Sequence, residues 1–407
     1  MKVDNNLKLD QPIIEKKPIF QASYPSYLKR SLLRKVINLI YDILSIIFLP
    51  IGICRYIHYK IHTFLGYYLF VPSQAYSKKE KIYKYLFNGE KQLVLQKDYL
   101  NEGREGLKKE FGAKEINIKT AGGEKLNGIF IPGKNSFGRT LNKDAPLIIH
   151  FLGQLGRYED LWHYDAMSNV RKCNIIIFNN SGVVKSEGRA SKKGLLIEAD
   201  SILQYAIKKL RVPIKDIIIH GHSFGGCQAT FLASKYKEVK LLNDRSFATV
   251  EKAMYYMAQK FFHQLFSSFF IMPFVLIGKL APQKVIDKIE SFVKFHKIYD
   301  DEKLLRPRTL AFLIKAVSSI IAYFIGKIAI IFDWNLEPEK YWKRVRGKKL
   351  IVCLADGKDE TIPFEASLLK NVNKQDREFM RVLDPEAMHW RPFKKEISNK
   401  IFRTLGL

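Results

Sequence analysis

The sequence predicts an α/β fold in which a mostly parallel sheet carries helices on both faces. Short β-branched runs alternate with helix-length segments from about residue 114 onward. Several runs, such as LIIHFLG, NIIIFNN and DIIIHG, are almost continuously apolar, which is typical of parallel strands buried on both faces. Segments with helical spacing fill the gaps from the third run to the sixth, which favours repeated strand–helix–strand units.

The predicted elements follow a regular order along the chain. Helices are predicted over 197–210 and 224–235. The predicted strands cover residues 115–120, 125–132, 145–153, 174–180, 216–223, 239–244, 348–355 and 378–384. The chain has 407 residues, 47% of them hydrophobic, so it can bury a full core, and its 28 Phe and 20 Tyr exclude wholesale disorder. We expect the sheet domain to cover residues 111–407.

The cysteines and the net charge restrict the class of protein. Cys54, Cys173, Cys227 and Cys353 are too few and too scattered for a disulfide framework or a CxxC metal site. The formal net charge of +28 favours an anionic partner, which could be nucleic acid, a phospholipid surface or an acidic substrate. The lysines are dispersed and no basic motif with interleaved aromatic residues is present, so we expect no nucleic-acid partner.

The N-terminal part is predicted to lie outside the sheet domain. Residues 1–30 are polar and proline-containing, and are predicted to be an irregular basic lead-in. Residues 31–110 are predicted to be a hydrophobic and basic helical extension. Its first apolar run covers 36–54, which as a helix at ~1.5 Å per residue approaches the roughly 30 Å of a hydrocarbon core. Asp42 inside this run and Pro50 near its end weaken a simple membrane-spanning interpretation.

A second aromatic and apolar stretch covers 61–71, and basic residues flank both stretches. These basic residues are Lys29, Arg30, Arg34, Lys35, Arg55, Lys60, Lys78, Lys79 and Lys81. The combination predicts an anchor that lies in, or re-enters, the surface of an anionic leaflet. The alternative is a pair of core helices that pack on the domain behind them. We therefore expect a membrane-associated protein, either peripheral or N-terminally anchored.

One long segment interrupts the strand–helix alternation. No strand is predicted between Asp244 and Lys348, and a helical cap insertion is expected over about 250–340. Residues 261–278 carry no formal charge, and 316–332 carry only Lys327. One interpretation is a buried helix with a lid over the carboxyl edge of the sheet. The other is an apolar cap that contacts lipid or an acyl chain.

The most informative stretch is Gly221-His222-Ser223-Phe224-Gly225, between a buried strand and a helix. A G-x-S-x-G turn in this context is a nucleophile elbow. The sharp turn strains Ser223, and a side chain at Gly221 or Gly225 would collide with the neighbouring strand or helix. The turn lifts the serine Oγ above the sheet, and the helix that begins at Phe224 directs its free N–H groups towards a developing oxyanion. Ser223 is therefore the predicted nucleophile.

A serine nucleophile needs a base and an acid that orients the base. In this fold the order along the chain is serine, acid and histidine. His389 follows the last predicted strand and is the only histidine after His296, so it is the predicted base. Asp356, Asp359 and Glu360 all follow the strand at 348–355, and spacing alone leaves the acid open. His220 and His222 are expected to be structural.

These motifs resemble those of the α/β-hydrolase superfamily over about residues 114–407. Members of this superfamily commonly place the acid in a turn of the form G-x-x-D-x-x-[VI]-P. Residues 359–363 (DETIP) match the second half of that turn, although Gly357 does not keep the first spacing. The resemblance therefore favours Asp359 over Asp356 as the acid.

The same resemblance indicates the second oxyanion donor. Residues 150–156 (HFLGQLG) are similar to the superfamily's strand-three turn F-H-G-N-x-G, with Leu152 in place of the usual histidine. By this resemblance the backbone N–H of Gln154 joins that of Phe224 in the oxyanion hole. Residues 180–188 and 242–247 resemble further loops of the superfamily.

The overall pattern is similar to serine hydrolases of intracellular bacteria, namely the chlamydial 43-kDa-type proteins and the lipase-like effector proteins of Legionella. The resemblance implies a lipase or esterase that is envelope-associated or is secreted into a host cell as an effector. The predicted reaction transfers an acyl group from a lipid or acyl (thio)ester to water, and it needs no metal and no cofactor. The alternative is a catalytically silent, membrane-associated interaction protein with the same fold.

Overall fold

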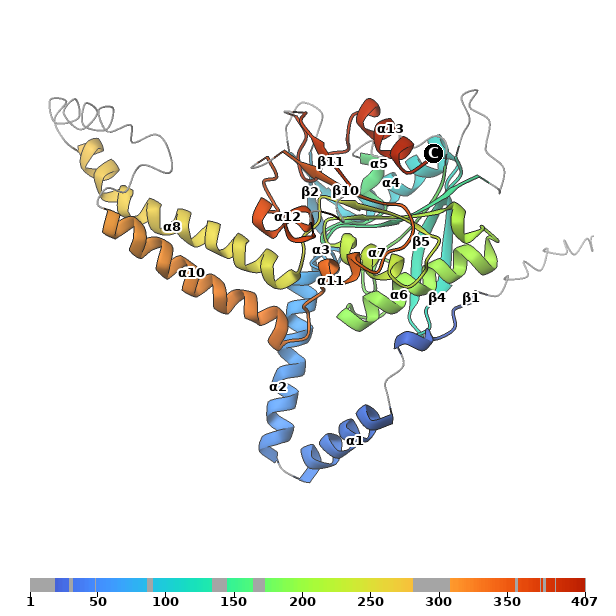
Figure 1. The fold of residues 1–407 in the computed structure, drawn as a ribbon, viewed down its shortest axis with the longest axis horizontal. Helices are drawn as coiled ribbons and strands as arrows, with labels where there is room; N and C mark the ends of the chain where they lie inside the picture. The colour runs from blue at the N-terminus through green and yellow to red at the C-terminus, as the bar shows by residue number, and fades with distance from the viewer. Residues whose placement is uncertain are drawn as a thin grey trace, which may run out of the picture.

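The computed structural model describes residues 19–28, 32–47, 49–85, 91–133, 145–163, 173–280, 308–355, 358–373, 375, 378–384 and 386–406. Within these residues, nine strands form one sheet in the order β1-β4-β5-β7-β6-β8-β9-β10-β11 (Figure 1). The strands are β1 (Phe20–Gln21), β4 (Lys114–Lys119), β5 (Lys125–Ile131), β6 (Leu147–Phe151), β7 (Asn174–Phe178), β8 (Ile217–His222), β9 (Lys240–Asp244), β10 (Lys349–Leu354) and β11 (Phe379–Val382).

The eight predicted strands correspond one to one with β4 to β11. β5 pairs antiparallel with both β4 and β7, and every pair from β7 through β6, β8, β9 and β10 to β11 is parallel. The reversed order of β6 and β7 means that the chain crosses over between them. The mostly parallel sheet is confirmed, and its strand order is that of the α/β-hydrolase fold.

Helices cover both faces of the sheet, as predicted (Figure 1). One face packs against α6 (Lys192–Gln204), α7 (Gly225–Ala233), α11 (Pro338–Trp342) and α12 (Leu368–Asn371). The other face packs against α4 (Gln96–Phe111), α5 (Asp160–His163) and α13 (Lys395–Thr404). Neighbouring residues of β8 serve different faces, since Ile217 and Ile219 join the first cluster and Ile218 joins the second. This alternation explains the continuously apolar strand sequences.

The N-terminal part contains more β-structure than the sequence predicted. Within the expected irregular lead-in, Phe20 and Gln21 form β1, which pairs parallel with β4 at the edge of the sheet. Within the expected helical extension, β2 (Lys81–Tyr85) and β3 (Lys91–Leu95) form an antiparallel hairpin. β1, β2 and β3 are strands of only two to five residues, which are too short to give a clear periodic signal in the sequence.

The predicted apolar run at 36–54 is divided between two helices, α1 (Leu32–Ile47) and α2 (Leu49–Leu65). The two helices meet at a bend of 114°. Pro50 lies in the first turn of α2, where its missing N–H costs nothing. Across the bend, Arg55 forms a 2.6 Å ion pair with Asp42. A β carbon at residue 52 would lie 2.6 Å from the carbonyl oxygen of Ser45, so Gly52 permits this close approach.

The insertion forms a hairpin of two long helices, α8 (Val250–Leu280) and α10 (Arg308–Ile331). The hairpin projects from the body of the protein, with α8 and α10 packed side by side (Figure 1). The expected lid across the sheet is therefore absent from the described part of the insertion. The two apolar helices pack on one another instead of on the strands.

Trp334 joins the N-terminal extension to the base of this hairpin. Its ring is fully buried and stacks on Phe70 and His62, with centroid distances of 4.8 and 5.2 Å. Its indole N–H donates to the carbonyl of His62 at 3.1 Å. The contact fixes α2 and η2 (Gly66–Phe70) against the sheet domain.

A buried carboxyl group lies in α6, beside the loop that follows β7. Glu198 is 2% exposed, and one of its oxygens accepts the backbone N–H of Ser181 at 3.2 Å. The other oxygen has no hydrogen-bond partner among the described residues. Burial raises the pKa of Glu198 to about 7, because water no longer solvates the carboxylate.

We predict that Glu198→Gln stabilises the protein at pH 8 and not at pH 5. The folded protein keeps a proton on Glu198 up to a pKa of about 7, whereas the unfolded chain loses it near 4.5. Stability therefore falls as pH rises through this window, by on the order of 3 kcal/mol. Thermal melts at both pH values measure the difference. Glu187→Gln, on the exposed neighbouring loop, is the control, and equal effects of Glu198→Gln at both pH values would contradict the prediction.

Candidate active site

The turn between β8 and α7 holds Ser223 in a left-handed conformation, with φ of 51°. The backbone N–H of Ser223 donates to the carbonyl of Asp244 at 2.9 Å, which ties the turn to the end of β9. A β carbon at Gly221 would lie 2.5 Å from Cβ of Ala229, and one at Gly225 would overlap the carbonyl oxygen of Phe151. The surrounding backbone therefore leaves room only for glycine on either side of the turn.

The structure brings Ser223, His389 and Asp359 into one hydrogen-bonded chain. Nε2 of His389 lies 2.8 Å from Oγ of Ser223, and Nδ1 of His389 lies 3.0 Å from the carboxylate of Asp359. The serine is 8% exposed and the histidine 5%. Because the ionised carboxylate can only accept, Nδ1 carries the proton and Nε2 can accept the serine proton. This is the arrangement of a Ser–His–Asp triad.

Asp359 is held in place by its own loop. Its Oδ1 accepts the backbone N–H groups of Thr361 at 3.0 Å and Ile362 at 2.7 Å. Glu360 points elsewhere and accepts the backbone N–H of His389 at 3.0 Å. Asp356, the alternative acid, lies outside the described residues. Of the described carboxylates after β10, Asp359 is the one that contacts the imidazole.

The two predicted oxyanion donors lie on either side of the nucleophile. Phe224 directly precedes α7 in helical conformation, and Gln154 follows β6 by three residues. A β carbon at Gly153 would lie 3.6 Å from Cβ of Ser223, so this loop passes close to the serine. Within the described part of the chain, neither the Gln154 nor the Phe224 backbone N–H has a hydrogen-bond acceptor. Both donors are free to bind an oxyanion.

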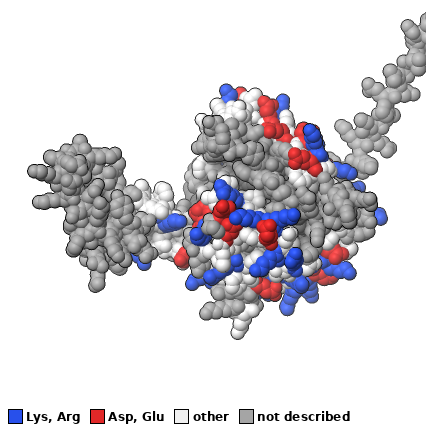
Figure 2. All heavy atoms as spheres, turned by 90° about the horizontal axis from the view of Figure 1, so that it is seen from above, with Lys and Arg blue, Asp and Glu red and all other residues white. Residues whose placement is uncertain are grey.

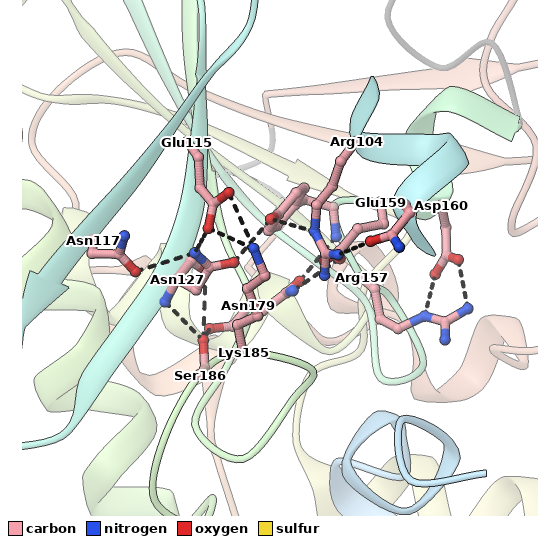
Figure 3. A network of polar contacts seen from close by, with 12 residues as sticks. Arg104, Glu115, Asn117, Asn127, Arg157, Glu159, Asp160, Asn179, Lys185 and Ser186 are labelled. Carbon is pink, nitrogen blue, oxygen red and sulfur yellow. Dashed lines mark hydrogen bonds and ion pairs between the residues drawn. The ribbon is translucent and has the colours of Figure 1, made fainter. Parts of the chain in front are cut away.

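We call residues 152–156 the oxyanion loop after its predicted role, and a polar network surrounds the residues that directly follow it in the chain (Figure 3). Tyr158 donates its backbone N–H to the side chain of Asn179 at 2.9 Å and its hydroxyl to Asn127 at 2.9 Å. Glu159 is fully buried and pairs with Arg104 at 2.7 Å. In front of the loop, the side-chain amide of Gln154 donates to the carbonyl of Leu69 in η2. The N-terminal extension therefore contacts the oxyanion loop directly.

A cavity of about 540 Å³ opens at the nucleophile and extends along the α13 face of the sheet. Ser223 and His389 lie in its polar part. Its apolar wall includes Ile148, Leu152, Ile175, Ile177, Leu242, Val352, Phe393, Ile401 and Phe402. No described residue of α8 or α10 lines it. The cavity therefore offers an apolar chain a buried surface beside Ser223.

A second group of polar side chains, around Asp244 and Arg245, lines the same cavity, and no role was predicted for it from the sequence. Asp244 pairs with Arg245 at 2.8 Å and lies 3.4 Å from Nε2 of His220, whose Nδ1 is 2.9 Å from Nδ1 of His150. The only available signal was an adjacent Asp–Arg pair at the carboxyl end of a strand. Among the described residues, no group of three or more His, Cys, Asp or Glu side chains could hold a metal ion.

The strand order, the elbow and the three hydrogen-bonded side chains together define an α/β-hydrolase architecture. A protein-family profile described as "Chlamydia CHLPS protein (DUF818)" matches residues 151–253, from the end of β6 to the start of α8. This segment contains the elbow and is about a quarter of the chain.

Several curated proteins of uncharacterised function are similar to parts of the chain. The Caenorhabditis elegans protein F37A4.1 is 31% identical over 143 residues, which is 35% of this chain and 27% of that protein. The Escherichia coli K12 protein YfhR is 29% identical over 116 residues, 28% of this chain and 40% of that protein. The Saccharomyces cerevisiae protein YNL320W, called an uncharacterized membrane protein, is 26% identical over 85 residues, 20% of this chain and 30% of its own length. The matches thus span well under half of each relative.

Solved structures of α/β hydrolases also align with the chain at low identity. The esterase Pf2001 of Pyrococcus furiosus is 15% identical with a TM-score of 0.43, covering 73% of this chain and 94% of that one. An α/β hydrolase of Vibrio vulnificus is 15% identical with a TM-score of 0.44, covering 84% and 90%. A serine hydrolase homologue of Coxiella burnetii is 15% identical with a TM-score of 0.39, covering 72% and 97%.

We predict that Asp359→Asn slows the reaction of Ser223 with a fluorophosphonate by about 10⁴-fold, because the amide no longer holds the imidazole in the required tautomer. Glu360→Gln is the matched control. Its amide oxygen can still accept the His389 backbone N–H, so its rate should stay within about tenfold of wild type. Equal rates for the two variants would show that Asp359 does not contribute to the reaction of Ser223.

Proposed function

We propose that the protein is a serine hydrolase that cleaves lipid or acyl esters, including thioesters, at a membrane surface. The observation that carries this proposal is the hydrogen-bonded Ser223–His389–Asp359 chain at the mouth of an apolar cavity. A serine activated in this way attacks carbonyl carbon, and the apolar wall favours an acyl chain as the bound group.

In the acylation half of the reaction, Oγ of Ser223 attacks the ester carbonyl while Nε2 of His389 takes its proton. The carboxylate of Asp359 stabilises the imidazolium that forms. The N–H groups of Gln154 and Phe224 donate to the oxyanion of the tetrahedral intermediate. Collapse of this intermediate breaks the ester bond, and His389 returns the proton to the departing alcohol or thiol.

In the deacylation half, the same groups act on water. His389 removes a proton from a water molecule, whose oxygen attacks the acyl–Ser223 ester. The oxyanion donors again stabilise the intermediate, and the fatty acid leaves as Ser223 regains its proton from His389. His389 accepts and returns every proton that moves in the two half-reactions. The proposed mechanism therefore uses no metal and no cofactor.

Membrane association is supported by two helical pairs whose apolar side chains lack cover. The exposed apolar residues include Ile37, Leu39, Ile40, Ile43 and Ile46 on α1, Ile53, Ile57 and Phe64 on α2, Phe261 and Leu265 on α8, and Ile320, Phe324, Ile330 and Ile331 on α10. A water-soluble surface rarely carries so many together. In Figure 2 the described atoms of the projecting hairpin are mostly white, whereas Lys and Arg are spread over the body among Asp and Glu.

One helix of the described chain is long and apolar enough to cross a bilayer, and a bent pair of helices is a second candidate only if the pair is taken as one span. Ile314–Ile331 in α10 has a mean hydropathy of 1.8, and only 28% of it is buried in the protein. Arg34–Ile46 together with Pro50–Phe70 meets the same criterion, but the bend of 114° makes this pair a broken span or a re-entrant element. The exposed Arg34, Lys35 and Lys60 on these helices suit an anionic leaflet.

We predict that a fluorophosphonate labels the wild-type protein and not Ser223→Ala. The label bonds covalently only to a serine whose Oγ is activated by a base. Intact mass analysis measures the adduct, and the melting temperature of Ser223→Ala shows that the fold is kept. Folded wild type that remains unlabelled, with and without vesicles, would favour the alternative of a catalytically silent membrane-associated protein.

We predict that the full chain floats with vesicles of phosphatidylglycerol and phosphatidylcholine. Replacing Leu39 and Ile46 on α1 and Phe324 and Ile331 on α10 with serine should weaken this binding by more than about tenfold, because each side chain contributes roughly 1.5–3 kcal/mol when buried. Leu383→Ser, which changes a residue that is 76% exposed on the sheet domain, is the control. Equal flotation of all variants would contradict a role for these helices.

A further inference from the structure

The loop that carries His389 is irregular, since β11 ends at Val382 and α13 begins at Lys395. A loop without regular structure leaves many of its carbonyl groups to water or to side chains from other parts of the chain. We propose that the buried Asp244–Arg245 pair positions His389 for catalysis by binding the backbone on both sides of this residue. The inference rests on the proposed hydrolase function, because it assigns a role within the same site.

Arg245 bridges the sheet and the loop with a single guanidinium group. Its Nη1 donates to the carbonyls of Met388 and Arg391, both at 2.7 Å, so the two contacts enclose His389. Its Nε and Nη2 donate to the two carboxylate oxygens of Asp244, both at 2.8 Å. The guanidinium also lies 4.0 Å from the ring centroid of Phe393, further along the loop. The side chain is 6% exposed, so water does not compete for these bonds.

Backbone geometry explains how consecutive residues can form this pair. In a strand, neighbouring side chains point to opposite faces. Arg245 leaves the strand conformation with φ of 47°, while its N–H donates to the carbonyl of Val352 in β10 at 2.8 Å. The left-handed residue breaks the alternation, and the side chains of Asp244 and Arg245 meet. A non-glycine residue in this conformation is strained, and the paired contacts offset the strain.

Asp244 orients the guanidinium because it remains ionised. Burial alone would raise the pKa of this carboxyl, but the charge of Arg245 and the hydrogen bonds from His220 and Arg245 hold the pKa well below its usual range. A buried bidentate pair of this kind fixes the plane of the guanidinium. Nη1 can then reach both carbonyl groups of the loop.

A second contact holds His389 itself. Nε2 of His222 lies 2.8 Å from the carbonyl oxygen of His389. Burial lowers the pKa of His222 to about 3, so the ring is neutral and donates its single N–H to this carbonyl. Glu360 accepts the backbone N–H of His389, so contacts with other residues hold both the backbone N–H and the backbone carbonyl of the base. Displacing a reacting group by about 1 Å can cost about 10²-fold in rate, so these contacts bear on catalysis.

The test compares the double variant Asp244→Asn/Arg245→Met with wild type in the full-length chain. The double change leaves no unpaired buried charge. The matched control is Lys252→Met/Glu339→Gln, which removes the 2.6 Å pair between α8 and α11, away from the cavity. With 4-nitrophenyl butyrate we expect the Asp244/Arg245 variant to lose about 10²-fold in kcat with KM changed less than about threefold, and the control to keep both values.

A chemical rescue separates positioning from folding. Arg245→Ala should lose activity to a similar extent, and guanidinium chloride at tens of millimolar should restore part of kcat, whereas urea should not. Arg245→Lys should remain impaired, because one ammonium group cannot bind the carboxylate and two carbonyls in the same geometry. A double variant with wild-type kcat, or rescue by urea as effective as by guanidinium, would overturn the inference while the proposed function stands.

The position of His389 can also be tested by nuclear magnetic resonance, which does not require the protein to be active. The His389 Nδ1–H bonded to Asp359 should give a downfield proton resonance in wild type and in the control. This resonance should shift or broaden in Asp244→Asn/Arg245→Met. An unchanged resonance would refute the positioning role. Failure of wild type to react with a fluorophosphonate would count against the proposed function instead, and the resonance would still decide where Asp244 and Arg245 act.

Discussion

The close packing of backbone around Ser223 constrains the rest of the active site. Neither Gly221 nor Gly225 has room for a β carbon, because α7 starts immediately against β8 and the carbonyl of Phe151. This proximity places the start of α7 and the turn after β6 on either side of one serine. The two proposed oxyanion donors, Gln154 and Phe224, therefore come from segments about seventy residues apart and need no further element to align them.

The parallel sheet explains how the remaining groups reach this serine. β8, β9 and β10 are neighbours and run in the same direction, so Ser223, Asp244 and the Asp359 loop all leave the sheet at one edge. The segment after β11, the next strand, carries His389 back across this edge. Its position depends on side chains that the sheet holds rigidly, namely Asp359, Arg245 and His222. Rigid strand ends thus define the geometry of a loop that has no regular structure of its own.

The apolar helices follow a different physical rule from the sheet domain. No protein surface covers their outward apolar side chains. Exposure of these side chains is unfavourable in water, whereas contact with lipid would be favourable. They are nevertheless attached to the catalytic region through Trp334, which fixes α2 and η2, and through the Gln154 side chain, which binds the carbonyl of Leu69. The surface proposed to meet the membrane and the oxyanion loop therefore share one packed segment.

The sequence by itself determined the eight long strands, the elbow and the candidate base, because strand burial and strand-to-helix turns leave local, periodic signals. Other features depended on contacts between distant segments. The partner of β1, the bend between α1 and α2, the outward course of α8 and α10, and the link from Arg245 to the His389 loop leave little trace in neighbouring residues. Spacing also left Asp356 and Asp359 as alternatives, and in the structure Asp359 is the described acid that reaches His389. Only tertiary packing decided these features, since it brings together residues that are not neighbours in the sequence, such as Arg245 and Met388.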